Sequence, residues 1–211
     1  TLLENPQKQW TPKDLFKFYY DYDLNNRAHF KSGKDFYYSD VNYFLLGLII
    51  EKTTGMPLAE AYRNYILEPA GMSNTYLEYH EAPTNDLVMT SSYIGGMEIN
   101  EDISTSFDWA GGGLVSTTKD LNLFMKALFS KKLIKNEKLF EEMITDSKNR
   151  YGYGLFLYNF SGVRFYGHSG FWGSDVFYNP DEKITMVISL NQTELPFSHK
   201  EFVRGFYGLI K

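Results

Sequence analysis

The sequence Tyr-Gly-His-Ser-Gly-Phe-Trp-Gly, residues 166–173, lies among runs that are typical of short β-strands. Val163–Gly167 leads into it, and Ser174–Tyr178 and Lys183–Leu190 follow it. Tyr151–Phe160, upstream, is also typical of a β-strand, and Gly, Asn-Pro and Asp-Glu turns separate the runs. Because strands joined by tight turns pair with their sequence neighbours, the four runs predict an antiparallel meander.

Far upstream, apolar residues recur every three or four positions after Asp40, as they do in a helix with one buried face. Gly55 ends the pattern, and Ser39 or Asp40 begins it as the N-cap. We therefore expect a helix here whose apolar stripe is buried. The stripe consists of Val41, Phe44, Leu45, Leu48 and Ile49.

Capping residues mark further helix starts. These are Thr11-Pro12-Lys13-Asp14, Thr117 with Asp120, and Ser198 with Glu201. Another helix is expected from Asn136 to Asp146. In the last helix, which Ser198 opens, we expect four apolar residues to point inward: Phe202, Phe206, Leu209 and Ile210.

These patterns predict an α/β protein of the α+β type. We assign residues 1–150 to a mainly helical region and residues 151–211 to an antiparallel sheet with a closing helix. Residues 73–113 have little periodicity and many small polar residues, which predicts a long loop.

The composition excludes several function classes. A net charge of −5 provides no basic face for nucleic acid. The absence of cysteine excludes disulfides, thiolate catalysis and zinc–thiolate sites. No apolar run approaches the roughly 18 to 20 residues of a membrane span. The four histidines are scattered without metal-ligand spacing, so we expect no metal. No phosphate-cradling glycine motif is present, and we expect no organic cofactor.

Tyr38-Ser39-Asp40 is the first candidate for chemistry. A tyrosine beside a helix N-terminus can have its phenolate stabilised by the helix dipole and a nearby cation. It can then serve as a general base or acid. The structural alternative is that Ser39 or Asp40 only caps the helix and Tyr38 is a core aromatic.

Gly167-His168-Ser169-Gly170 is the second candidate. His168 can supply positive charge near neutral pH, and Ser169 offers a hydroxyl to a substrate carboxylate. Gly170 permits close backbone approach, and the Phe171 N–H is then a candidate oxyanion donor. The structural alternative is a His and a Ser at an exposed strand end.

A rival interpretation makes Ser169 the nucleophile of an esterase elbow, which requires Gly-x-Ser-x-Gly followed by a helix. Here the fifth position is Phe171, and a turn and a strand follow. The partner residues of such a triad would be Asp175 or Asp181 and His199, all crowded into the same short segment. The match is poor.

Ser-x-x-Lys, the other nucleophile spacing, places a Ser one helical turn from a Lys base. Its one occurrence is Ser116-Thr117-Thr118-Lys119, at a helix start. Because Thr117 and Asp120 form a capping box there, the structural interpretation accounts for this segment.

Taken together, the motifs resemble the serine β-lactamase and penicillin-binding protein family, in its class C-like branch. That branch includes D-alanyl-D-alanine carboxypeptidases, D-amino-acid peptidases and esterases. The resemblance follows family order over roughly residues 30 to 195. It is carried by Phe36–Asp40 with Asn42–Glu51 (Tyr-x-Asn and its helix), Pro69–Thr75 (Pro-Leu-Gly-Met-x-x-Thr), Gly112–Thr117 with Asp120-Leu121 (Gly-Gly-Leu-x-Ser-Thr-x-x-Asp-Leu) and Gly167–Gly170 (Lys/His-Thr/Ser-Gly).

The resemblance implies a β-lactamase/transpeptidase-like fold and roles for these residues. Tyr38 is implied as the proton-relaying residue, and His168, Ser169 and Gly170 line the carboxylate side of the cleft. Asp40 stands where the family usually has Asn. Since an ionised Asp only accepts hydrogen bonds, we expect Asp40 to hold a Lys or a substrate ammonium and to disfavour β-lactams relative to other amides or esters.

A second departure concerns the nucleophile. In the family the Ser-x-x-Lys helix lies upstream of the Tyr motif, but no Ser-x-x-Lys precedes Tyr38 here. The resemblance therefore implies that the nucleophile helix and the first strands of the sheet lie outside this chain. The chain would then be one incomplete catalytic domain, inactive alone, with the missing N-terminal segment of the same fold as its partner.

The sequence thus predicts the C-terminal part of a serine hydrolase that acts on a D-Ala-terminated peptide, a β-lactam or a small ester through an acyl-enzyme. By resemblance we expect an extracytoplasmic location. The alternative is a non-catalytic module of the same fold that binds muropeptides or a protein partner.

Overall fold

The computed structural model describes residues 4–83, 86, 88–99, 103–145 and 149–210. They form two compact units. The first consists of Thr1–Leu67, Asn74–Leu87 and Glu101–Ser116, and the second of Glu68–Ser73, Val88–Asn100 and Thr117–Lys211. These units follow contacts between residues, whereas the division predicted at residue 150 follows element type and stays a prediction.

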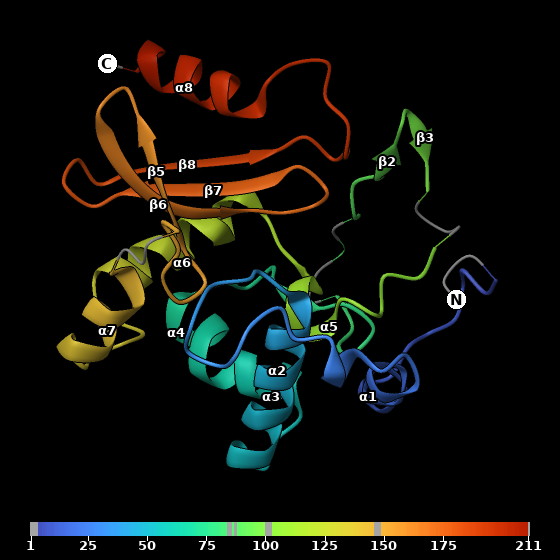
Figure 1. The fold of residues 1–211 in the computed structure, drawn as a ribbon. Coiled ribbons are helices and arrows are strands. Elements are labelled where there is room, and N and C mark those ends of the chain that lie inside the picture. Colours follow the sequence, from blue (N-terminus) through green and yellow to red (C-terminus); the bar gives the residue numbers. More distant parts are fainter. Residues whose placement is uncertain (1–3, 84–85, 87, 100–102, 146–148, 211) are drawn as a thin grey trace. The chain divides into compact units, whose positions relative to one another are not determined.

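The predicted α+β class is confirmed, because helices dominate the first part of the chain and an antiparallel sheet with a closing helix ends it (Figure 1). In chain order the elements are α1 (Pro12–Asp21), η1 (Leu24–Asn26), α2 (Asp40–Thr54), α3 (Leu58–Tyr62), η2 (Arg63–Leu67), α4 (Glu68–Ala70), β1 (Tyr76–Leu77), β2 (Tyr93–Ile94), β3 (Met97–Glu98), α5 (Trp109–Gly112), β4 (Leu114–Val115), α6 (Thr118–Phe129), α7 (Glu137–Ile144), β5 (Phe156–Phe160), β6 (Val163–Ser169), β7 (Ser174–Asn179), β8 (Ile184–Ser189) and α8 (His199–Leu209).

The predicted helix starts are confirmed in detail. Thr11 and Asp14 form both hydrogen bonds of a capping box at α1. The side chains of Thr117, Asn136 and Ser198 cap α6, α7 and α8 by accepting backbone N–H bonds. The end predicted for α7 at Asp146 lies outside the described residues. No helix in the described ranges is long and apolar enough to cross a bilayer.

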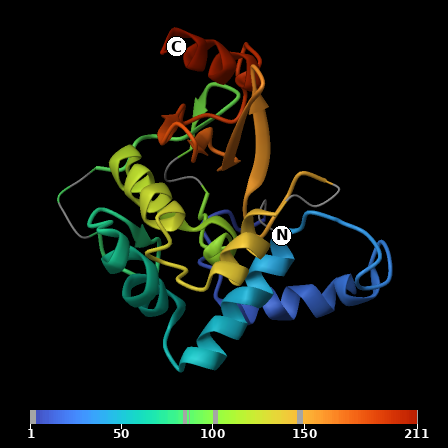
Figure 2. The ribbon, with the colours of Figure 1, turned by 90° about the vertical axis from the view of Figure 1, so that its left-hand side faces the viewer.

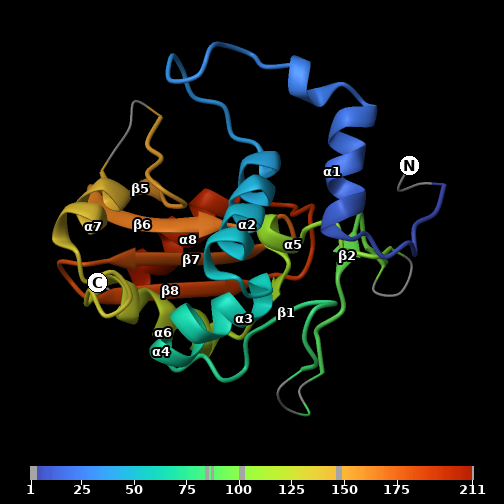
Figure 3. The same cartoon turned by 90° about the horizontal axis from the view of Figure 1, so that it is seen from below.

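In the first unit, α2 packs against α5 (Figure 3). Gly47 permits this approach, because a Cβ at this position would lie 2.6 Å from the Ala110 Cβ and 2.8 Å from the Trp109 ring. Trp109, which is 3% exposed, lies in a core formed with Leu58 and Leu77.

The predicted buried stripe of α2 is wrong in part. Phe44 and Leu48 pack on this core, but Leu45 and Ile49 are exposed. The helix turns the face around Gly47 toward Trp109, since only a residue without a side chain fits there. An apolar surface of α2 therefore faces away from the core of its unit.

In the second unit, the predicted meander is confirmed as a sheet with strand order β5-β6-β7-β8, all antiparallel. The core on one face consists of residues around Phe165, Phe177, Val203 and Tyr207, beneath α8. The core on the other face contains Tyr166 and residues of α6 and α7. Helices thus lie on both faces (Figures 1 and 2).

The predicted inward face of α8 is wrong. Val203 and Tyr207, one helical turn apart, are the buried residues, and the Tyr207 hydroxyl donates to Glu182 at 2.8 Å. The residues expected inside are all exposed: Phe202, Phe206, Leu209 and Ile210. Both sets have helical spacing, so the pattern alone did not decide which one meets the sheet.

Candidate functional site

Tyr38, Ser39 and Asp40 lie at the N-terminus of α2, in the first unit. Asp40 is the first helical residue, where the helix dipole favours negative charge. Ser39 occupies the N-cap position without a side-chain capping bond. Tyr38 is 39% exposed, and its ring centroid lies 6.4 Å from that of Tyr43. A half-exposed phenol at this helix end is accessible to a reacting group.

Asp108 lies close to Asp40. The pKa of Asp108 is raised to about 6 because its carboxyl is buried and because Asp40 and Glu78 add negative charge nearby. The backbone supports this proximity, since a Cβ on Gly111 would lie 3.7 Å from the Asp40 Cβ. The start of α2 therefore has an acidic environment in which one carboxyl titrates near neutral pH.

Ser116, of the Ser-x-x-Lys spacing, lies between β4 and α6 and not within a helix. Its hydroxyl shares a 2.8 Å hydrogen bond with that of the buried Thr75. These contacts agree with a structural role for this segment.

His168 and Ser169 are the last residues of β6, in the second unit. Gly167 before them is required by packing, because a Cβ there would lie 1.9 Å from the Val176 carbonyl oxygen on β7. The His168 Nδ1 atom donates to the Ser169 carbonyl at 2.9 Å, and its ring lies 5.2 Å from that of Phe156. This hydrogen bond leaves Nε2 as the ring nitrogen for other partners.

Neighbouring residues of a strand point to opposite faces of its sheet. Ser169 shares the face of Phe165, and its hydroxyl lies 3.3 Å from the Tyr158 hydroxyl. His168 shares the face of Tyr166, toward α6. The prediction that His168 and Ser169 line one wall stays a prediction: strand alternation directs their side chains to different faces, and Phe156 lies near both.

Gly170 and Phe171 form the turn between β6 and β7. The Gly170 N–H donates to the Ser174 carbonyl at 2.6 Å, and the Gly173 N–H donates to the Gly170 carbonyl at 3.1 Å. Phe171 is 71% exposed, and its N–H has no acceptor in the described part of the chain. A backbone N–H that stays available within a hydrogen-bonded turn fits the predicted role of oxyanion donor.

Sequence reasoning missed three residues that the structure brings to these places. Asp108 stands directly before the Trp-Ala-Gly-Gly turn of α5, but only the fold places it near Asp40. Tyr158 and Lys200 meet Ser169 in a cavity of the second unit. Among the described residues, no group of three or more His, Asp or Glu side chains has the arrangement of a metal site.

Within the first unit, then, the structure joins Tyr38 and Asp40 with Asp108. Within the second it joins His168, Ser169, Gly170 and Phe171. A single site that combines the two groups stays a prediction.

Comparisons with known proteins support the predicted family resemblance. The protein-family model described as Beta-lactamase matches residues 3–203. Protein flp of Staphylococcus aureus (strain NCTC 8325 / PS 47) is 26% identical over 184 residues, which cover 80% of this chain and 36% of flp. The chain therefore spans little more than a third of that relative.

Two solved structures resemble the whole chain. A D-stereospecific amidohydrolase from Streptomyces sp. has 25% identity and a TM-score of 0.82, covering 98% of this chain and 64% of that one. The octameric penicillin-binding protein homologue from Pyrococcus abyssi has 28% identity and a TM-score of 0.75, covering 95% of this chain and 47% of that one. These likenesses confirm the predicted fold, of which the chain matches a part.

Proposed function

Because the chain belongs to the Beta-lactamase family, we propose that it forms part of a serine hydrolase that cleaves an amide or ester through an acyl-enzyme. The observation that carries this proposal is the Tyr38–Asp40 segment at the start of α2, inside the matched residues. A phenol next to a helix N-terminus supports a role in proton relay, because the helix dipole stabilises its phenolate.

In the proposed site each side chain has a separate task. Tyr38 relays the proton between the nucleophile and the leaving group. Asp40 holds the ammonium of a Lys or of the substrate. His168 provides positive charge for a substrate carboxylate, and the Phe171 N–H stabilises the oxyanion of the tetrahedral intermediate. Ser169 and Gly170 support substrate binding at the end of β6.

We assign the nucleophile to a segment outside these 211 residues. The chain has no Ser-x-x-Lys before Tyr38, and it spans 64% of the Streptomyces amidohydrolase. The exposed apolar side chains of Leu45, Leu46 and Ile49 on α2 offer a packing surface for such a segment. The chain alone is then inactive, and its first partner is the remainder of its own fold.

The proposed substrate is a D-configured amide, such as a D-Ala-terminated peptide, or a small ester. The similarity to a D-stereospecific amidohydrolase supports the D configuration. The acidic surroundings of Asp40 favour a substrate with a free ammonium group. A peptidoglycan-derived substrate would place the protein outside the cytoplasm.

A non-catalytic binding module is the second candidate, favoured by the lack of a Ser-x-x-Lys in family order. The esterase elbow at Ser169 receives no support, because Ser169 ends β6 and the chain continues through a turn into β7. An elbow serine requires a helix at that point.

The test is to label the complete gene product with a fluorescent fluorophosphonate and a fluorescent penicillin, and then to map the adduct by mass spectrometry. We expect an adduct on a serine outside residues 1–211. An adduct on Ser116 or Ser169 would contradict the assignment. The absence of any adduct would favour the binding module.

The role of Tyr38 is tested in the same protein. Tyr38→Phe removes the proton-relaying hydroxyl and is expected to slow labelling by about 100-fold, the lower range for general acid–base catalysis. Tyr37→Phe is the matched control, because Tyr37 is an adjacent, more exposed tyrosine with no assigned role. Equal rates for the two variants would refute the proton-relay role.

A further inference from the structure

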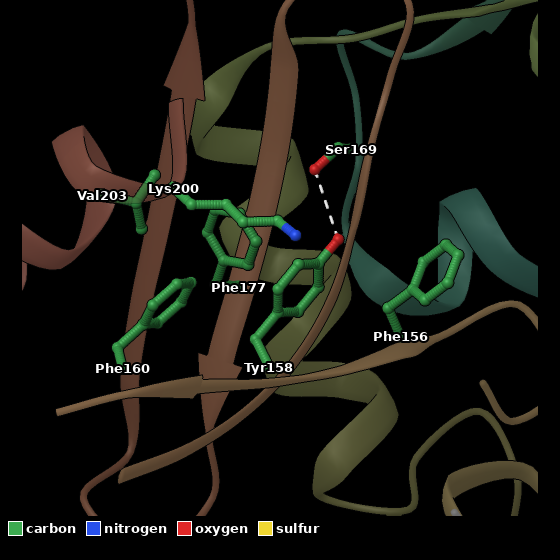
Figure 4. A pocket seen from close by; sticks show the side chains of 7 residues that line it. All are labelled: Phe156, Tyr158, Phe160, Ser169, Phe177, Lys200 and Val203. Atoms are coloured by element: carbon green, nitrogen blue, oxygen red, sulfur yellow. Dashed lines mark hydrogen bonds between the residues drawn. The ribbon is translucent and has the colours of Figure 1, made fainter. Parts of the chain in front are cut away.

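The second unit contains a cavity of about 340 Å³ between the sheet and α8 (Figure 4). It belongs to the face of the sheet opposite to that of His168. Its volume lies within the range of about 300 to 1,000 Å³ that small-molecule sites occupy. The lining residues come from β5, β6, β7 and α8: Phe156, Tyr158, Phe160, Ser169, Phe177, Lys200 and Val203.

The walls of this cavity are aromatic and fixed by packing. Phe160, Phe177 and Val203 are each less than 5% exposed. The ring centroids of Tyr158 and Phe177 lie 4.8 Å apart, edge to face, and those of Phe160 and Phe177 lie 5.3 Å apart. Such walls suit a phenyl ring or a short alkyl chain without rearrangement.

One end of the cavity is polar. The Tyr158 and Ser169 hydroxyls lie 3.3 Å apart, and the Lys200 ammonium group points toward them (Figure 4). The pKa of Tyr158 is raised, chiefly because the phenol is buried and also because Asp175 is nearby, although the hydrogen bond with Ser169 lowers it. Tyr158 therefore keeps its proton and can donate a hydrogen bond.

The charge around this end is mostly positive. Lys200 has no ion-pair partner within the described ranges. A neighbouring cavity shares Tyr158, Phe160 and Lys200 with the first, and Arg150 and Arg204 line it too. Its one acidic residue is Glu201, which pairs with Arg204 at 3.8 Å. The buried Asp175 also lies near Tyr158 and pairs with Ser169 across β6 and β7. Three basic side chains (Lys200, Arg150 and Arg204) therefore outnumber two acidic ones (Glu201 and Asp175), and this balance favours an anion over a cation at the polar end.

We infer that this cavity binds an amphiphilic carboxylate, meaning a carboxylic acid with an aryl or short alkyl tail. The tail packs against the cavity wall formed by Phe160, Phe177 and Val203. The carboxylate accepts hydrogen bonds from Tyr158 and Ser169 and pairs with Lys200. Binding here requires neither the nucleophile nor turnover, although the cavity shares Ser169 with the proposed hydrolase site.

The test is a binding measurement on the complete gene product with 4-phenylbutyrate and its uncharged analogue 4-phenylbutyramide. Isothermal titration calorimetry supplies Kd, and saturation-transfer NMR identifies the part of the probe in contact. We expect the carboxylate to bind at least about fivefold more tightly than the amide, because only the carboxylate pairs with Lys200.

Variants locate the site. Lys200→Met is expected to weaken carboxylate binding by about tenfold, the loss of one charge-assisted hydrogen bond. Ser169→Ala should weaken it by about fivefold. Lys132→Met, which removes an exposed lysine far along the chain from the cavity lining, should leave Kd unchanged.

Three outcomes would overturn the inference. One is equal Kd values for the carboxylate and the amide. Another is an unchanged Kd in Lys200→Met. The third is no binding of either probe, which is also the result expected if another part of the gene product fills the cavity.

Discussion

Asp108 gives the sharpest stability prediction, because its raised pKa couples folding of the first unit to pH. The pKa rises from 3.8 to about 6 through burial and through the charges of Asp40 and Glu78. Replacing the carboxyl with the uncharged amide in Asp108→Asn removes the cost of ionising it in the folded protein.

The direction of the pH effect follows from the numbers of protons that the folded and unfolded states bind. Between about pH 4 and pH 6 the unfolded chain loses the Asp108 proton while the folded protein still holds it, so stability falls as pH rises. Above about pH 6 both states have lost this proton, so the free-energy cost of ionising Asp108 in the folded protein is constant. A rise of about two pH units corresponds to about 3 kcal/mol, and partial exposure of the side chain reduces the expected effect to about 1 to 2 kcal/mol.

The assay is urea unfolding at pH 4, 5, 6 and 7, followed by tryptophan fluorescence, to which the buried Trp109 contributes. The free-energy difference between Asp108→Asn and the wild type should grow by about 1 to 2 kcal/mol from pH 4 to pH 7 in favour of the variant. Asp181→Asn, at an exposed carboxylate in the β7–β8 turn, should give a flat difference. A flat difference for Asp108→Asn as well would refute the reasoning.

Three further predictions concern single substitutions. Gly167→Ala places a methyl group 1.9 Å from a carbonyl oxygen of β7, so it should reduce the free energy of unfolding by at least about 3 kcal/mol through lost ladder hydrogen bonds. Gly205→Ala, with no atom within 4 Å of the new methyl group, should stabilise α8 by about 0.5 to 1 kcal/mol. Thermal melts of the two variants test both expectations. Tyr207→Phe removes the bond to Glu182 and should cost about 1 kcal/mol or more in urea unfolding, and an unchanged midpoint would contradict it. Asp40→Asn in the complete gene product should raise turnover of penicillin relative to p-nitrophenyl esters, and an unchanged ratio would remove the proposed role of this carboxylate.

Local chemistry made much of the fold predictable from the sequence. Capping residues such as Thr11, Thr117 and Ser198 mark helix starts because they satisfy backbone N–H groups within their own turn. The turns of the meander are likewise local, and the strands pair in chain order. These features depend on neighbouring residues only.

The facing of the helices was not predictable in the same way. In α8 the sets Phe202 with Phe206 and Val203 with Tyr207 both have the spacing of a buried stripe. The sheet selects the second set because Tyr207 reaches both Phe165 and Glu182. Helical periodicity carries no information about such a distant partner.

The residues of the candidate site also fall into those that the sequence made predictable and those that it did not. Tyr38, Asp40 and the His168–Phe171 segment stand out because motif residues are contiguous in the chain. Asp108 and Lys200 are isolated in the sequence, and only tertiary contacts give them neighbours. Their contribution depends on desolvation and charge, which no sequence spacing encodes.

The uncovered aliphatic face of α2 has a practical consequence for handling this polypeptide. Leu45, Leu46 and Ile49 are 36%, 49% and 55% exposed, on one helix. Contiguous surfaces of this kind promote self-association in water. When the 211 residues are produced alone, light scattering should increase with protein concentration. The polypeptide should bind chaperones during expression and require mild detergent to stay monodisperse.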